Sequence, residues 1–264
     1  MSAVRSMDGR HVSYGALGFV AAAVFAGCAA LEGLVKSPPP HPAEAGPEVG
    51  APGYAIWRAA LASDDPRIVV SLKARRLWLL EGSDTVLSAP IAIGRNETFT
   101  FQGRTFRFHT PRGRRKVLKK EENPVWVPPD WHYLEKAAYR KLEVVRLERG
   151  KRYMLGDSTY IEIRGEDVGR VNRFGNFWPF TPGKEIIFDG KIFIPPLDTR
   201  QRKIPDALGP YKLDLGDGYL IHGTHRYNRD SIGRAASHGC IRMRNEDLAR
   251  LYAKVKVGTP VYIY

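Results

Sequence analysis

The sequence predicts a mainly β fold, a sandwich or barrel with one clear helix near the C-terminus. Many short segments alternate apolar and polar residues, and Gly, Pro, Asn or Asp residues separate them. An apolar fraction of 43% is high enough for a packed core, and a length of 264 residues suits one or two domains. Because only one segment has convincing helical periodicity, a β sandwich or barrel is favoured.

In the first half of the folded part, the pattern predicts one short helix and four strands. A charged turn at residues 73–76 separates two apolar runs and indicates a hairpin. Gly94 ends the next run, and a short alternating run follows it. The expected helix is residues 55–62, and the expected strands are residues 68–72, 77–80, 86–93 and 105–108.

The second half contains two further hairpin signals and the one clear helix. Asp189-Gly190 is a strong two-residue hairpin turn, and Gly216-Asp217-Gly218 separates another pair of strands. Asn245 is expected to cap a helix that Gly258 ends, with apolar residues at helical spacing between them. The expected strands are residues 160–164, 185–188, 191–194, 211–215, 219–221 and 261–264.

Residues 1–28 are predicted to be an export signal. Arg5 and Arg10 precede an apolar run that is short for a membrane span and typical of a signal h-region. The run ends in Phe25-Ala26-Gly27-Cys28, which resembles a bacterial lipobox, so Cys28 is a predicted lipidation site. An uncleaved signal anchor is the alternative, because Phe25 stands where Leu is usual and Asp8 is unusual in a basic n-region. Both interpretations place the domain on the periplasmic side of the cell envelope, tethered to the membrane.

A proline-rich tether without a core is predicted for residues 29–53, followed by one folded domain over residues 54–264. The chain carries 41 Lys and Arg against 28 Asp and Glu, a net charge of +13 that favours an anionic partner. Nucleic acid is a poor candidate, because the chain is exported and has no recognised nucleic-acid motif. The basic run over residues 104–120 either adds to this attraction or is a solvated hairpin tip.

Cys240 is the strongest candidate for chemistry. The only other cysteine is in the export segment, so Cys240 has no evident disulfide partner, and His222, His225 and His238 lie near it in sequence. A thiol becomes a good nucleophile when a base or a positive field raises its thiolate fraction. We therefore predict Cys240 as the nucleophile. His222 is the predicted base, because it ends an expected strand and is followed by glycine, which suits a rigidly held imidazole.

The residues around Cys240 suggest further roles. Backbone N–H groups of Gly239 and Cys240 are the expected oxyanion donors, because glycine allows an unusual backbone path. His238 either shapes the oxyanion pocket and contacts substrate, or braces the loop. Arg242 offers a planar, two-pronged donor for a substrate carboxylate. Ser237 is expected to bind substrate or to hydrogen-bond within the loop.

Two segments, His222-Gly223-Thr224 and Ser237-His238-Gly239-Cys240-Ile241-Arg242-Met243, resemble the signature of the L,D-transpeptidase catalytic domain, also called the YkuD domain. Three other pieces agree with that family in order, and the resemblance spans roughly residues 67–264. These pieces are Thr110-Pro111-Arg112-Gly113, residues 208–215 and Gly258-Thr259-Pro260-Val261.

The resemblance implies a β-rich fold and acyl transfer on peptidoglycan stem peptides through a cysteine thioester. Cys240 would attack the carbonyl of the third stem residue, the terminal D-amino acid would leave, and an amine from a second stem or a protein would resolve the thioester. The backbone of Gly223 would orient His222, and Arg242, Ser237 and Thr224 would bind substrate. No cofactor and no metal are implied.

Several alternatives stay open. Water as acceptor would make the chain an L,D-carboxypeptidase or amidase of the same family. The three histidines and Cys240 could form a zinc site, although their spacing fits no common zinc pattern. An inactive wall-binding module is a further alternative. The segment at about residues 130–205, which is longer than the family needs, is either a lid or groove wall bearing Trp131 and Trp178 or an inserted hairpin with its own core.

Overall fold

The computed structural model describes residues 40–264, except for the side chains of Arg226 and Tyr227. This part of the chain contains twenty β-strands and three α-helices. No strands within it close into a barrel, so the prediction of a mainly β fold is confirmed in its sandwich form. None of its helices is long and apolar enough to cross a membrane. The predicted export signal, Cys28 and the first part of the tether lie outside the described residues.

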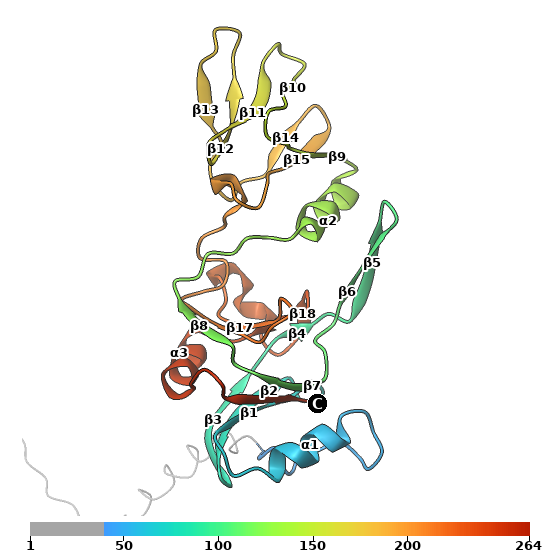
Figure 1. Ribbon diagram of the computed structural model, residues 1–264. Coiled ribbons are helices and arrows are strands. Elements are labelled where there is room, and N and C mark those ends of the chain that lie inside the picture. The colour runs from blue at the N-terminus through green and yellow to red at the C-terminus, as the bar shows by residue number, and fades with distance from the viewer. Residues whose placement is uncertain (1–39) are drawn as a thin grey trace, which may run out of the picture. The chain divides into compact units, whose positions relative to one another are not determined.

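The first sheet has five strands in the order β3-β2-β1-β20-β7 (Figure 1). β1 and β20 are parallel, and the other neighbours are antiparallel. Four of these strands were expected from the apolar runs, but β7, with four polar residues or glycine, was not. The strands are β1 (Arg67–Ser71), β2 (Arg76–Glu81), β3 (Asp84–Pro90), β7 (Gly113–Lys116) and β20 (Pro260–Ile263).

The second sheet has four strands in the order β19-β17-β16-β8. β16 (Tyr211–Asp214) pairs antiparallel with both β8 (Lys119–Glu122) and β17 (Leu220–His222). β17 pairs parallel with β19 (Ile241–Arg242). This last pairing brings the two sequence motifs of the chain side by side, because one motif begins at the end of β17 and the other runs through β19.

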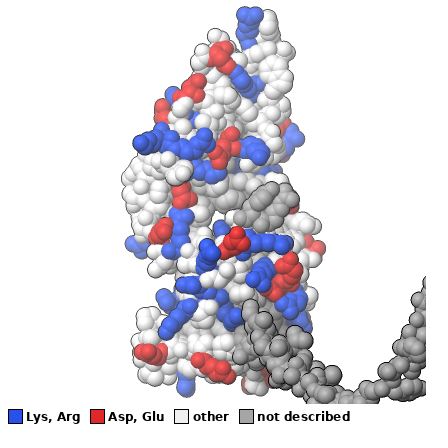
Figure 2. All heavy atoms as spheres, turned by 180° about the vertical axis from the view of Figure 1, so that it is seen from behind, with Lys and Arg blue, Asp and Glu red and all other residues white. Residues whose placement is uncertain are grey.

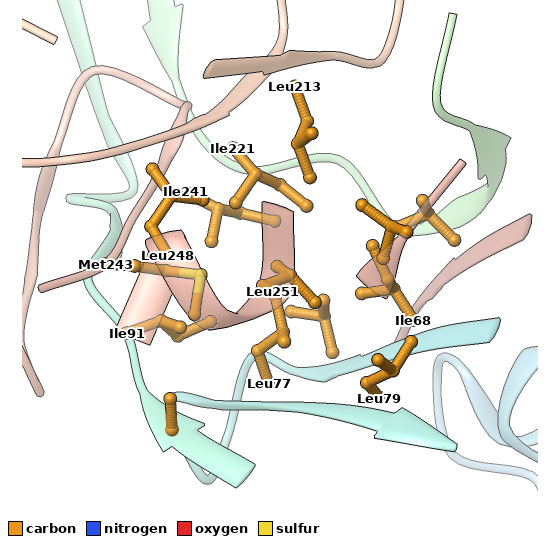
Figure 3. Close-up of a cluster of buried hydrophobic side chains, with 14 of the residues drawn as sticks. Ile68, Leu77, Leu79, Ile91, Leu213, Ile221, Ile241, Met243, Leu248 and Leu251 are labelled. Carbon is orange, nitrogen blue, oxygen red and sulfur yellow. The ribbon is translucent and has the colours of Figure 1, made fainter. Parts of the chain in front are cut away.

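The main core lies between these two sheets (Figure 3). Leu213, Ile221 and Ile241 of the second sheet point toward Leu77 and Leu79 of the first, and all five are buried. Helix α3 (Asn245–Lys254) closes one side of this core with two buried leucines, as its helical spacing predicted. Since strand side chains alternate between faces, the neighbours of the three second-sheet residues must point away from the core.

The opposite face of the first sheet is also covered. Helix α1 (Tyr54–Leu61) packs there against Val69, Trp78 and Tyr262, so β1 is buried on both faces. The segment before α1 packs here too, because the indole N–H of Trp78 donates to the carbonyl of Pro40 (3.0 Å). From residue 40 onward the proline-rich segment therefore rests on the domain instead of extending away from it as a tether.

Residues 130–205 form a separate group of elements. Helix α2 (Asp130–Arg140) was not expected, although its buried Tyr133, Leu134 and Ala137 recur at helical spacing. The segment holds small hydrophobic clusters of its own, which agrees with one of the two interpretations of this stretch. Its strands form an antiparallel sheet, β10 (Tyr153–Met154), β11 (Tyr160–Arg164), β12 (Asp167–Val171) and β13 (Phe177–Pro179), and a second sheet, β14 (Ile186–Phe188), β15 (Lys191–Ile194) and β9 (Glu143–Arg146).

Short elements connect these groups. β4 (Ile93–Gly94) pairs with β18 (Ala235–Ser237), and β5 (Glu97–Phe101) forms a hairpin with β6 (Arg104–Phe108). Phenylalanines of this hairpin pack against the cluster that contains α2. The segment just before residue 130 hydrogen-bonds to the end of the 130–205 stretch, through the backbones of Trp126 and Ile204. The 3₁₀ turns are Arg200–Arg202 and Arg226–Ser231.

Some of the basic side chains of residues 104–120 are engaged within the fold and are not available as a surface patch. The Lys120 ammonium donates to the carbonyls of Tyr252 and Val255 at the end of α3 (2.6 and 2.7 Å), and Arg115 donates to the carbonyl of Leu215 (3.1 Å). Cations near a helix C-terminus also interact favourably with its dipole. On the face in Figure 2, Lys and Arg are interspersed with Asp and Glu. These two cations therefore stabilise the fold.

Leu213→Ala is expected to lower the free energy of unfolding by about 2–5 kcal/mol, because a fully buried side chain leaves a cavity between the two sheets. Leu197→Ala is the matched control: Leu197 is 62% exposed, so its loss should cost less than about 0.5 kcal/mol. Urea unfolding measures both values. Equal costs would show that the core is not where the structure places it.

Candidate active site

Four ionisable residues form one row across the second sheet. Strand register pairs Glu121 with Lys212, Lys212 with His222, and His222 with Arg242. Directly opposite residues point to the same face of a sheet, and here that face lies away from the core. Cys240 comes two residues before Arg242, so its side chain lies on this face too. The alternation of the sheet thus gathers the predicted nucleophile, base and carboxylate-binding residue.

This face forms one wall of a cavity of about 1180 Å³. Cys240, His222, His238, Arg242 and Lys212 all contribute to its lining. The facing wall comes from the β5–β6 hairpin, from α2 and from the segments on either side of residues 130–205. Its aromatic members are Phe106, Phe108, Trp126, Trp131 and His132.

The imidazole of His222 is buried, and its orientation is fixed by one hydrogen bond. Nδ1–H donates to the carbonyl of Gly223 (2.7 Å), as the resemblance implied, so Nε2 carries the lone pair. A Cβ at Gly223 would lie 2.4 Å from Oδ1 of Asn245 and 3.1 Å from the carbonyl oxygen of Leu208, so any larger residue would displace the Asn245 amide. Burial, and then the charge of Arg242, lower the pKa of His222 from 6.5 to about 3. The neutral imidazole stabilises the fold above pH 6.5, and this stabilisation is lost as the pH falls toward 3.

Thr224 and Asn245 hold the loop that carries this carbonyl. Thr224 N–H donates to Asn245 Oδ1 (2.8 Å), and the Thr224 hydroxyl donates to the carbonyl of Met243 (2.7 Å). The expectation for Asn245 therefore changes. Asn245 does not cap α3, whose N-cap is Arg244 without a side-chain hydrogen bond. The Thr224 hydroxyl is engaged with the backbone, while Thr224 itself contributes to the lining of the cavity.

The loop before Cys240 is held by hydroxyl groups. The Ser237 hydroxyl donates to the carbonyl of Cys240 (2.6 Å) and accepts from Gly239 N–H (3.1 Å). The Thr110 hydroxyl donates to the carbonyl of Gly239 and accepts from Gly94 N–H, both at 2.8 Å. Ser237 therefore acts within the loop, the second of its two expected roles. Gly239 N–H is engaged, which leaves Cys240 N–H as the candidate oxyanion donor.

The thiol of Cys240 is free and partly exposed to the cavity. Its Sγ lies 3.7 Å from the carbonyl of Gly218. Burial is the main cause that raises the pKa of this thiol, and the backbone N–H of Leu220, followed by the charge of Arg242, opposes the effect. Because the pKa of His222 is lowered, the resting pair consists of a neutral thiol and a neutral imidazole.

Arg242 brings an unpaired positive charge to the cavity. Among the described side chains, no carboxylate lies within ion-pair distance of its guanidinium, and burial lowers its pKa. A partly buried cation without a counter-ion favours the arrival of an anion. The neighbouring cation, Lys212, already pairs with Glu121 (3.3 Å).

His238 faces the other wall of the cavity. Its Nε2 donates to a carboxylate oxygen of Glu135 on α2 (2.8 Å), and its ring stacks on Trp131 with the centroids 4.2 Å apart. Sequence reasoning did not find Glu135 or Lys212. The Glu135 contact spans 103 residues and has no local signal. Lys212 could have been found, because it alternates with Leu213 in an expected strand.

The zinc hypothesis finds no support in this geometry. Within residues 40–264, no group of three or more His, Cys, Asp or Glu side chains converges as metal ligands. Nδ1 of His222 and Nε2 of His238 donate to oxygen acceptors instead.

Residues 65–263 match the model of the YkuD family, described as the L,D-transpeptidase catalytic domain. The chain belongs to this family. It is 50% identical over 58 residues to the probable L,D-transpeptidase YbiS of Escherichia coli K12, which covers 22% of this chain and 18% of that protein. It is 40% identical over 95 residues to the putative L,D-transpeptidase YkuD of Bacillus subtilis 168, covering 35% and 55%. The matched stretches span about a fifth to about half of these relatives.

Solved structures of L,D-transpeptidases are more distant. One from Xylanimonas cellulosilytica is 17% identical, with a TM-score of 0.41, over 81% of this chain and 70% of that chain. The catalytic domain from Enterococcus faecium is also 17% identical, with a TM-score of 0.39, over 77% and 99%. The family membership rests on the sequence match. The chain therefore contains an L,D-transpeptidase-family catalytic domain.

Alkylation of Cys240 by iodoacetamide is expected to be slow at neutral pH, because burial raises the pKa of the thiol. In a Cys28→Ser background Cys240 is the only thiol. The rate should rise with pH to a midpoint above the value of about 8.5 for free cysteine, and return to about 8.5 in urea as the control. A midpoint near 6 in the folded protein would instead demonstrate a preformed thiolate.

Proposed function

We propose that this domain is a cysteine-dependent L,D-transpeptidase that acts on peptidoglycan stem peptides through a thioester. The observation that supports it best is the shared face of β17 and β19. There the lone pair of His222 Nε2, the thiol of Cys240 and the unpaired guanidinium of Arg242 all belong to one cavity. Acyl transfer needs a nucleophile, a base, an oxyanion donor and a group that holds the donor, and each has a candidate here.

In the proposed first step, His222 Nε2 takes the thiol proton while Sγ of Cys240 attacks the carbonyl of the third stem residue. The N–H of Cys240 donates to the oxyanion that forms. As the intermediate collapses, the bond to the terminal D-amino acid breaks, and its amine leaves with the proton from His222. An acceptor amine then attacks the thioester, passes a proton to Nε2, and the sulfur leaves and recovers that proton.

Binding of the donor is proposed to prime the base. In the free enzyme the charge of Arg242 helps to lower the pKa of His222 to about 3, after the larger effect of burial. A stem carboxylate on the guanidinium would offset that charge and raise the pKa of His222 toward the range useful for proton transfer. The base would then gain strength when substrate is present.

The size of the cavity leaves room for a second stem as the acceptor. A volume of about 1180 Å³ exceeds the roughly 300–1,000 Å³ of ordinary small-molecule sites. The cavity also has two walls from different parts of the chain, so a second stem could lie beside the donor. The L,D-carboxypeptidase or amidase alternative requires only water as the acceptor. An inactive wall-binding module would have no need for the oriented base.

The proposed location is the periplasmic side of the cell envelope, with a lipid anchor at Cys28. Its support is the apolar run and the lipobox-like end of residues 1–28. Labelled fatty acid should appear on the wild-type protein and be absent from Cys28→Ser. Intact, unlabelled protein in the cytosol would contradict both the location and the peptidoglycan substrate.

Incubation with a disaccharide-tetrapeptide, followed by mass spectrometry, tests the function. The expected product is a cross-linked dimer that has lost one terminal residue. Cys240→Ala should form none, and His222→Ala should be slower by about 10²–10⁴-fold, the usual span for a general base. Tripeptide alone would favour the carboxypeptidase, and full activity in Cys240→Ala would refute the proposed nucleophile.

Arg242→Lys is expected to lower kcat/KM for the stem peptide, although it keeps the charge, because lysine lacks the two-pronged donor that matches a carboxylate. The exposed Arg250→Lys, whose guanidinium pairs only with Asp247 on the same helix, is the matched control and should leave the value unchanged. Steady-state kinetics with the same fragment measures both. An unchanged value in Arg242→Lys would remove Arg242 from the site.

A further inference from the structure

We propose that helix α2 of residues 130–205 is a working part of the active site, and that its Glu135 is a positioning residue for His238. This proposal rests on the acyl transfer described above. It gives a function to a stretch that the sequence left as either a groove wall or an independent insertion.

The first observation is a hydrogen-bonded group of three residues. Oε2 of Glu135 accepts from His238 Nε2–H (2.8 Å), and Oε1 of the same carboxylate pairs with Arg95. Nη1 of Arg95 also lies 3.0 Å from His238 Nε2. A single ring nitrogen cannot both donate to the carboxylate and accept from the guanidinium. Glu135 therefore decides which ring nitrogen of His238 carries the proton.

The second observation is the aromatic enclosure of the same imidazole. The indole of Trp131, one helical turn before Glu135, stacks on it with an interplanar angle of 19° and a centroid distance of 4.2 Å. The ring of Phe108 meets it edge-on at 82° and 4.6 Å. One helix thus supplies both the hydrogen bond and the stacking face, and the ring of His238 is fixed in tilt as well as in rotation.

The charges are consistent with this arrangement. Burial raises the pKa of Glu135, but the hydrogen bonds from His238 and Arg95 outweigh it, so the pKa lies below its usual range. Burial also lowers the pKa of His238, and Glu135 opposes that effect. At neutral pH a charged carboxylate therefore faces a neutral imidazole, which must present Nε2–H to it.

His238 transmits this restraint to the loop before the nucleophile. From one side, the Thr110 hydroxyl holds the carbonyl of Gly239 (2.8 Å). From the other side, Glu135 holds the ring of the preceding residue. Gly239 has a φ of 131°, a conformation that favours glycine, and its peptide leads directly to Cys240 N–H. The direction of the candidate oxyanion donor thus depends on both restraints.

Helix α2 is itself anchored well enough to act in this way. The buried guanidinium of Arg202 donates to Asp130 (2.9 Å) and to the carbonyls of Pro128 and Pro195, both at 2.7 Å. The start of α2 is therefore tied to the rest of residues 130–205, while Glu135 reaches across to the catalytic loop.

The first test reads the tautomer of His238 by ¹⁵N NMR in the full chain, and it does not depend on activity. The wild type should show Nε2–H. In Glu135→Leu the guanidinium of Arg95 is left to donate to Nε2, so the proton should move to Nδ1. An Nε2–H tautomer that persists in Glu135→Leu would overturn the proposal.

The second test is kinetic. Glu135→Leu should lower kcat with the disaccharide-tetrapeptide by about 10- to 100-fold, the size expected for a lost charge-assisted hydrogen bond, and change KM less. Glu135→Gln, which keeps an acceptor oxygen, should recover part of that loss. Glu185→Gln is the matched control, because its carboxylate pairs with Lys136 and Arg140 of the same helix without touching His238. It should stay within about twofold of the wild type.

The outcomes separate this proposal from the proposed function. Equal losses in the Glu135 and Glu185 variants would show that α2 only needs to be folded, and would overturn the positioning role. Wild-type turnover that Glu135→Leu leaves unchanged would overturn it as well. If the wild type forms no product, the proposed function fails, and the tautomer measurement still decides whether Glu135 controls His238.

Discussion

The parallel pairing of β17 with β19 is the constraint on which the rest of the site depends. It brings His222 and Arg242 opposite each other, and the alternation of a strand then fixes what each face carries. Ile221 and Ile241, the residues just before them, are sealed in the main core. A register slip of one residue would bury the two polar side chains and expose the two isoleucines. Core packing therefore holds the site in place.

The electrostatics of the site follow from the same burial. Desolvation lowers the pKa of His222 and raises the pKa of Cys240, so neither group is charged at rest. A neutral thiol is a weak nucleophile and is less exposed to oxidation than a thiolate. On the proposed mechanism, a donor carboxylate on Arg242 removes the smaller of the two causes that lower the pKa of His222, and so strengthens the base. The free domain therefore holds no standing thiolate.

Much of the fold could be predicted from local sequence. The hairpins around residues 73–76 and 189–190 and the helix from residue 245 carry their own turn and spacing signals. β7 and β8 could not be predicted in this way, because their mostly polar residues show no apolar alternation and they are strands only through their neighbours. Helix α2 had a usable signal in Tyr133, Leu134 and Ala137, but the stretch was interpreted as either a groove wall or an inserted hairpin, and no helix was predicted there.

The residues of the site also differ in whether local sequence could reveal them. Local sequence was enough to find Cys240, His222 and Arg242, because each lies within a short motif whose residue types indicate the chemistry without knowledge of the fold. The amide of Asn245 was wrongly predicted to cap a helix, because its hydrogen bond to Thr224 N–H joins two motifs that only the folded chain brings together. Glu135 was harder still to predict, because its contact with His238 depends on how α2 packs against the β5–β6 hairpin.

The central claim is that Cys240 carries the acyl group, and rapid quenching followed by mass spectrometry tests it most directly. Wild-type protein mixed with a disaccharide-tetrapeptide and quenched in acid should gain the mass of the fragment without its terminal residue. The added mass should map to the peptide that contains Cys240, and hydroxylamine should remove it as expected for a thioester. Consumption of substrate with no covalent species on Cys240, or with the added mass on another residue, would contradict the account.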